Sequence, residues 1–74
     1  MKNKIRQTRM GQGITQTQLA KDIGISRPYL SDVENGNSVP TIGIAIKIAE
    51  ALGSTVEHIF LNEMSYVVDK EQIS

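Results

Sequence analysis

The sequence predicts a compact all-α domain of five helices, followed by a short C-terminal tail. Its 74 residues suffice for one modest core, and the absence of cysteine leaves apolar packing to supply the stability. Apolar residues recur at helical spacing, whereas no run alternates with a period of two before residue 64. We therefore expect a helical domain over residues 1–62 and a tail over residues 63–74.

The first two helices are predicted from caps and stop signals. Asn3 caps a first helix that runs to about residue 10, where Gly11 stops it. The apolar face of this helix is thin. Thr15 caps a second helix, and Gly24 ends it because glycine tolerates the left-handed conformation. One buried stripe of the second helix holds Leu19, Ala20 and Ile23.

The third helix follows the second after only three residues. Ser26 is its N-cap, and Pro28 in the first turn lacks a backbone donor that would have no helical partner there. The helix spans about 27–35, and Gly36 ends it. At 100° per residue, its residues divide between two sides. One side is small or polar, with Arg27, Pro28, Ser31 and Asp32, and the other is apolar, with Tyr29, Leu30 and Val33.

Two further helices complete the domain. Thr41 caps a fourth helix over about 42–52, in which Ile44, Ile48 and Leu52 recur at a spacing of four, and Gly53 ends it. Thr55 caps a short fifth helix that holds Val56, Ile59, Phe60 and Leu61.

The zero net charge conceals a strong separation of charge along the chain. Residues 1–27 carry a net charge of +5, and residues 28–74 carry −5. Such a chain can present a basic face to phosphate while its acidic face stays in water. The alternative is that these charges are scattered over a solvated surface.

The motifs resemble one known family, the helix-turn-helix regulators related to the phage repressors and Cro, also called the xenobiotic-response-element family. The resemblance spans 5–61. It is carried by Gly13-Ile14-Thr15-Gln16, Leu19-Ala20, Gly24-Ile25-Ser26, Tyr29-Leu30-Ser31, Glu34-Asn35-Gly36, Pro40, Lys47-Ile48-Ala49 and Ala51-Leu52-Gly53. It implies a lambda-repressor-like five-helix bundle whose second and third helices form the DNA-binding unit.

The resemblance also implies which residues contact DNA. The base-contacting positions fall on Ser26, Arg27, Pro28, Ser31 and Asp32, and the phosphate-contacting positions on Gln16, Tyr29, Asn35, Asn37, Ser38 and Thr41. Their chemistry suits these roles, because Arg27 can bind a guanine bidentately and Pro28 can touch a thymine methyl group. Asp32 can accept from a cytosine amino group, or it can act by repelling phosphate. Gln16 opens a helix whose amide groups attract an anion.

Two charged residues are assigned to the fold by the same resemblance. It implies a structural ion pair between Arg9 on the first helix and Glu34 near the end of the third; the alternative puts Arg9 on a phosphate. His58 has no second ligand at a metal-binding spacing, so we expect no metal site and no cofactor. No nucleophile–base pair or phosphate-binding glycine loop indicates an enzyme.

We therefore predict a sequence-specific regulator that binds double-stranded DNA, represses transcription and reads half of a palindromic operator with its third helix. The alternative is an interaction module, such as an antitoxin, that binds a partner protein as well as DNA. An enzyme is a distant third class. Without a signal peptide or a membrane-length apolar segment, a cytoplasmic location is expected.

A homodimer is expected, because one recognition helix reads few bases. The predicted interface comprises Phe60, Leu61, Met64, Tyr66, Val67 and Val68. The alternation of Met64, Tyr66 and Val68 suits a strand that pairs across a two-fold axis. A continued fifth helix and a frayed tail are the alternatives.

Overall fold

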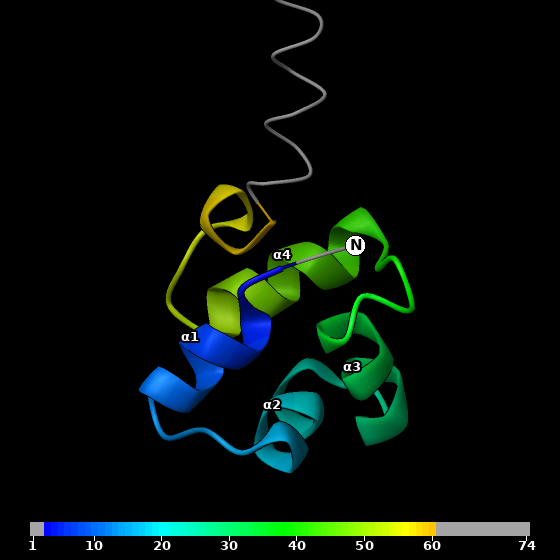
Figure 1. The fold of residues 1–74 in the computed structure, drawn as a ribbon, viewed down its shortest axis with the longest axis horizontal. Helices are drawn as coiled ribbons and strands as arrows, with labels where there is room; N and C mark the ends of the chain where they lie inside the picture. The colour runs from blue at the N-terminus through cyan, green and yellow to red at the C-terminus, as the bar shows by residue number, and fades with distance from the viewer. Residues whose placement is uncertain (1–2, 61–74) are drawn as a thin grey trace, which may run out of the picture.

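The computed structural model describes residues 3–60, which form four helices and a fifth helical segment at 56–60 (Figure 1). The helices are α1 (Ile5–Gly11), α2 (Gln16–Ile23), α3 (Arg27–Glu34) and α4 (Ile42–Ala51). Both α3 and α4 contact α2, so α2 lies at the centre of the packing. The predicted all-α class is confirmed, and these residues contain no strand.

Three helices begin where the sequence places their caps. The hydroxyl oxygen of Thr15 accepts a hydrogen bond from the Gln18 amide at 3.1 Å. Ser26 and Thr41 accept from the third residue after them in the same way, each at 3.2 Å. Each bond satisfies one of the amide groups that a helix start leaves without an internal partner.

Gly24 ends α2 and Thr55 caps the fifth helical segment as predicted, whereas the start of α1 and the ends of α1, α3 and α4 shift by one residue. Lys4 occupies the N-cap position of α1, although Asn3 Oδ1 still accepts from the Ile5 amide at 3.0 Å. Gly11 is the last residue of α1 and not the residue that follows it. The C-caps of α3 and α4 are Asn35 and Leu52, which the prediction had placed inside those helices.

The core draws side chains from every helix. Its largest fully buried members are Phe60, Ile5, Leu19, Leu30, Ile48, Leu52, Ile59 and Val33. Burial of each contributes about 1.5–3 kcal/mol relative to exposure. The ring of Phe60 is only 1% exposed within its own chain, so it has no surface left for a partner subunit. We therefore remove Phe60 from the predicted dimer interface; Leu61, Met64, Tyr66, Val67 and Val68 lie outside the described residues.

Polar contacts compensate for the thin apolar face of α1, on which only Ile5 and Arg9 are buried. The backbone amide of Lys4 donates to the carbonyl of Ile59 at 2.8 Å. Gln12 Nε2 donates to the Leu52 carbonyl at 2.6 Å, and Asn3 Nδ2 to the Val33 carbonyl at 2.8 Å. Hydrogen bonds from the residues that flank α1 therefore tie this helix to three other parts of the bundle.

Gly24 provides a direct test of the turn between α2 and α3. Its φ is 78°, in the left-handed region, and its amide caps α2 by donating to the Ala20 and Lys21 carbonyls. No atom lies within 4 Å of a Cβ built there, so any cost is conformational. We expect Gly24→Ala to lower the free energy of unfolding by about 1–2 kcal/mol in urea denaturation.

Gly11 is the matched control for this substitution. A Cβ built at Gly11 also meets no atom within 4 Å, but Gly11 is not among the glycines with positive φ. Gly11→Ala should therefore leave stability unchanged or raise it slightly, because alanine favours helix. An equal loss at both positions would contradict the assigned role of Gly24.

Candidate nucleic-acid interface

The helix–turn–helix consists of α2, α3 and the short turn that joins them. Gly24 reverses the chain, Ile25 packs against the core, and Ser26 caps α3. Figure 1 shows α2 and α3 together at one end of the molecule. A short turn between two packed helices is the arrangement that presents the second helix to a DNA groove.

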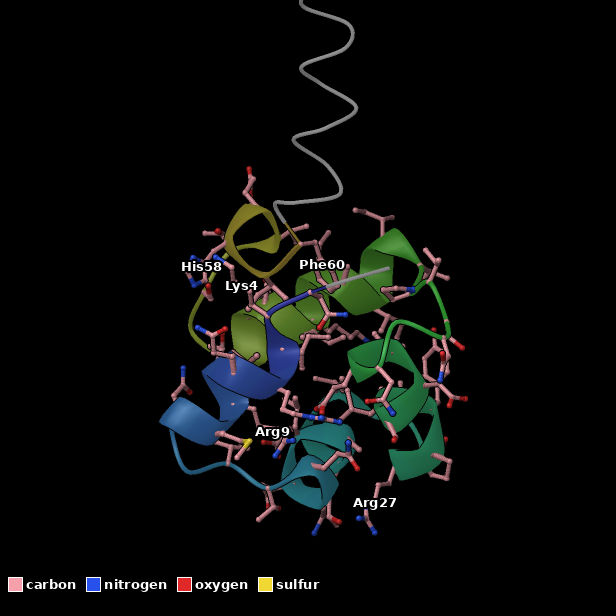
Figure 2. The ribbon with its side chains drawn as sticks, viewed as in Figure 1. Lys4, Arg9, Arg27, His58 and Phe60 are labelled. Carbon is pink, nitrogen blue, oxygen red and sulfur yellow. The ribbon has the colours of Figure 1, made fainter. Side chains whose placement is uncertain are left out.

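The two sides of α3 separate as the sequence predicts. Leu30 and Val33 are completely buried, and Tyr29 is half-buried against the core. The predicted base-contacting residues lie on the opposite side, where Ser26, Arg27, Pro28 and Asp32 are exposed and Ser31 is half-buried. In Figure 2, Arg27 points outward at the edge of the molecule. The buried side anchors α3, and its polar side is left accessible to solvent.

Gln16 connects α2 to both ends of α3. Its Nε2 donates to Glu34 Oε1 at 3.2 Å, and its Oε1 accepts from Arg27 Nε at 3.2 Å. Gln16, Arg27, Pro28 and Ser31 line an open hollow of about 210 Å³ between the helices. The Gln16 amide, which is predicted to face a phosphate, therefore also orients the Arg27 guanidinium, which is predicted to read a base.

Arg9 and Glu34 form a buried ion pair. Arg9 Nε donates to Glu34 Oε2 at 2.9 Å, and Arg9 Nη2 donates to Glu34 Oε1 at 3.1 Å. The third Arg9 nitrogen, Nη1, donates to the Ile14 carbonyl at 3.0 Å. The Arg9 and Glu34 side chains are 10% and 0% exposed, respectively. Figure 2 shows Arg9 between α1 and α2. This geometry is that of a structural pair and leaves little of Arg9 for a phosphate.

The remaining predicted phosphate contacts lie in the segment between α3 and α4. Asn35, Asn37 and Thr41 are exposed, and Ser38 is half-buried. The Thr41 hydroxyl oxygen caps α4, whereas Asn35 Oδ1 accepts a hydrogen bond from Arg6 Nη2 at 2.7 Å. These residues therefore have structural contacts as well as accessible surface.

Arg6 is the residue that the sequence reasoning missed. It belongs to α1, outside the helix–turn–helix, yet its guanidinium reaches Asn35 and comes within 3.5 Å of Glu34 Oε1. A signal was present in the sequence, because residues three apart on a helix lie on the same side. Given the Arg9–Glu34 pair, this spacing places Arg6 near Glu34, whereas the bond from Arg6 to Asn35 has no such local signal.

Neither a metal-ligand cluster nor a membrane-length apolar helix occurs among residues 3–60. No group of three or more His, Cys, Asp or Glu side chains there could hold a metal ion. His58 is exposed and lies at the end of the molecule opposite Arg27 (Figure 2). Within the same residues, no helix has the length and apolar character needed to cross a membrane.

Comparisons with known proteins agree with this geometry. The chain matches the Helix-turn-helix family over residues 5–59. It is 40% identical over 63 residues to an HTH-type transcriptional regulator of Methanocaldococcus jannaschii, covering 85% of this chain and 96% of that protein. It is 33% identical over 63 residues to the ImmF control region 10 kDa protein of Bacillus phage phi105, covering 85% and 70% of the two chains.

A solved structure is similar over the same domain. SinR, the master regulator for biofilm formation, in complex with DNA, gives a TM-score of 0.67 at 30% identity, covering 72% of this chain and 86% of that chain. The family match spans most of the chain, and the Methanocaldococcus jannaschii relative is named as a transcriptional regulator. This chain therefore belongs to the helix-turn-helix family of DNA-binding transcriptional regulators.

Proposed function

We propose that this chain is a homodimeric repressor in which each subunit reads one half of a palindromic operator with α3. The observation that supports this most directly is the polar side of α3. Arg27, Pro28 and Asp32 are exposed there, while the buried side fixes the orientation of the helix. Repression would follow from occupation of the operator, because a bound dimer excludes other proteins from the same DNA.

The residues divide between sequence reading and positioning. Ser26, Arg27, Pro28, Ser31 and Asp32 would meet base edges, and Arg27 would bind a guanine through its paired donors. Gln16, Tyr29, Asn35, Asn37, Ser38 and Thr41 would hold the DNA backbone. Gln16 would serve both purposes, because its amide oxygen already holds Arg27 Nε. Two subunits would read half-sites about 34 Å apart.

Substitutions of Arg27 and Gln16 test the division between residues that read bases and residues that hold the backbone. Selection from a random DNA pool with the parental protein would first identify the operator. We expect Arg27→Ala to cost about 1–3 kcal/mol of specific binding and to relax the preference at one base position. Gln16→Ala should weaken binding to every sequence, and it should also broaden the preference at the Arg27 position because Arg27 loses its support.

Affinity for the operator and for single-base variants of it would be measured for each protein. If both substitutions left affinity and base preference unchanged, α3 would not be the reading helix. A protein that selected no sequence at all would contradict the proposed function itself.

A second candidate function is an interaction module that binds a partner protein as well as DNA, as an antitoxin does. One observation favours the interaction module: a structure of SinR in complex with the SinI protein is also similar to this chain. That structure matches with a TM-score of 0.67 and 30% identity, covering 72% of this chain and 52% of that chain. The mass of the purified chain in solution separates the candidates. A stable homodimer supports the repressor, whereas a monomer that assembles only with a second protein supports the module.

A further inference from the structure

Arg6 places an exposed guanidinium beside the residues proposed to bind DNA. Its Nη2 donates to Asn35 Oδ1 at 2.7 Å, and its Nε lies 3.5 Å from Glu34 Oε1. Gln16 Nε2 donates to that same Glu34 oxygen at 3.2 Å. Because both groups contact one oxygen atom, Arg6 and Gln16 are neighbours in space although they come from α1 and α2.

The contact with Glu34 does not neutralise the positive charge of Arg6. Arg9 occupies both oxygens of Glu34 through two hydrogen bonds, and the pair is buried. Arg6 approaches the same carboxylate at a longer distance, and its side chain is 55% exposed. Two guanidinium groups therefore share a single carboxylate, so one positive charge remains at the surface. With Arg27 on the other side of Gln16, two exposed cations flank one amide.

We propose that Arg6 binds a phosphate of the DNA backbone next to the one that contacts Gln16, and that Asn35 positions its guanidinium. The inference rests on the proposed function. It extends the DNA-contacting surface from the helix–turn–helix onto α1. A guanidinium presents paired donors that match phosphate oxygens, and one already held in place loses less conformational freedom on binding.

The salt dependence of binding measures this contact. Each phosphate contact releases condensed counterions. The logarithm of the affinity therefore falls linearly with the logarithm of the salt concentration, and the slope is proportional to the number of contacts. The probes would be the duplex selected by the parental protein and a duplex of unrelated sequence. We expect Arg6→Gln to make the slope of log affinity against log salt less steep by about 0.9 on both duplexes. Binding at low salt should be about tenfold weaker, with base preference unchanged.

Three further variants test whether the lost charge of Arg6 and its positioning by Asn35 account for the change in binding. Arg6→Lys keeps the charge and should retain the parental slope. Lys4→Gln removes an equal charge from the start of α1, at the end of the molecule opposite Arg27 (Figure 2), and should also leave the slope unchanged. Asn35 is itself proposed to contact the backbone, so Asn35→Ala should still weaken binding when Arg6 is already glutamine, but by less than it does in the parent. Additive losses would overturn the positioning role of Asn35.

A structural role for Arg6 gives a different result. The Arg6 contact with Glu34 is half-exposed, so its loss should change the melting temperature little, and binding would be measured where every variant is fully folded. A parental salt slope for folded Arg6→Gln, alongside weakened binding by Arg27→Ala, would overturn the inference and leave the proposed function intact. Failure of the parental protein to bind either duplex would contradict the proposed function instead.

Discussion

Arg9→Met is expected to destabilise the domain by about 3–5 kcal/mol, because it leaves the Glu34 carboxylate buried without its main partner. The Glu34 side chain is 0% exposed, so water cannot replace the two hydrogen bonds from Arg9. Gln16 Nε2 and the more distant Arg6 would be the remaining partners. A small domain has only about 0.05–0.15 kcal/mol of stability per residue, so this loss would be a large part of the total. Urea denaturation monitored by circular dichroism measures it.

Removing the other member of the pair, Glu34, should lower the stability of the domain by less. In Glu34→Leu the charge left behind belongs to Arg9, whose long side chain keeps its hydrogen bond to the Ile14 carbonyl and is already 10% exposed. Its head group can move toward water, which a carboxylate on a shorter buried side chain cannot do. The double variant Arg9→Met with Glu34→Leu should recover much of the stability, since replacing both members of a buried pair is often neutral.

The alternative role of Arg9 predicts a different pattern. If Arg9 bound a phosphate, Arg9→Met would fold as stably as the parent and would lose only DNA affinity. The observed geometry opposes that pattern, because each of the three Arg9 nitrogens already donates within the protein. Stability and affinity measured on the same variant therefore decide between the two roles.

The parts of the fold that were predicted correctly depend on local chemistry. A hydroxyl that caps a helix bonds to an amide three residues ahead, so Thr15, Ser26 and Thr41 could be assigned from the sequence alone. Gly24 is similar, because the left-handed conformation that ends a helix strongly favours glycine. The two sides of α3 follow from helix geometry once its start is fixed.

The interior of the candidate site could not be predicted in this way. Gln16 bonds to Arg27 and Glu34, which are 11 and 18 residues away, and Arg6 bonds to Asn35, which is 29 residues away. Such partners are set by how the helices pack, and helical periodicity reports only neighbours within one or two turns. The same limit explains why Phe60 was assigned to the dimer interface. An apolar pattern indicates that Phe60 is buried, but it does not show whether the core of its own chain or a partner subunit covers the ring.

Truncation after Asn62 is expected to leave the helical fold intact and to yield monomers that bind the operator at least about 100-fold more weakly. The core of the described residues ends with Ile59 and Phe60, so the shortened chain keeps every residue of that core. The loss of affinity follows from the loss of the second half-site, because a linked second contact typically raises avidity by about 10²–10⁴. Sedimentation, thermal melting and operator binding of the two chain lengths test the three parts of the expectation.

The strongest rival to the tail is an exposed apolar strip beside and along α4. Val39, Ile42 and Ile46 are 71%, 67% and 43% exposed, and Ile42 and Ile46 lie one turn apart on the same side of the helix. If the tail holds the dimer together, full-length Ile42→Gln with Ile46→Gln should remain dimeric and bind the operator like the parent. A truncated chain that still sediments as a dimer, together with a full-length glutamine variant that does not, would move the interface from the tail to α4.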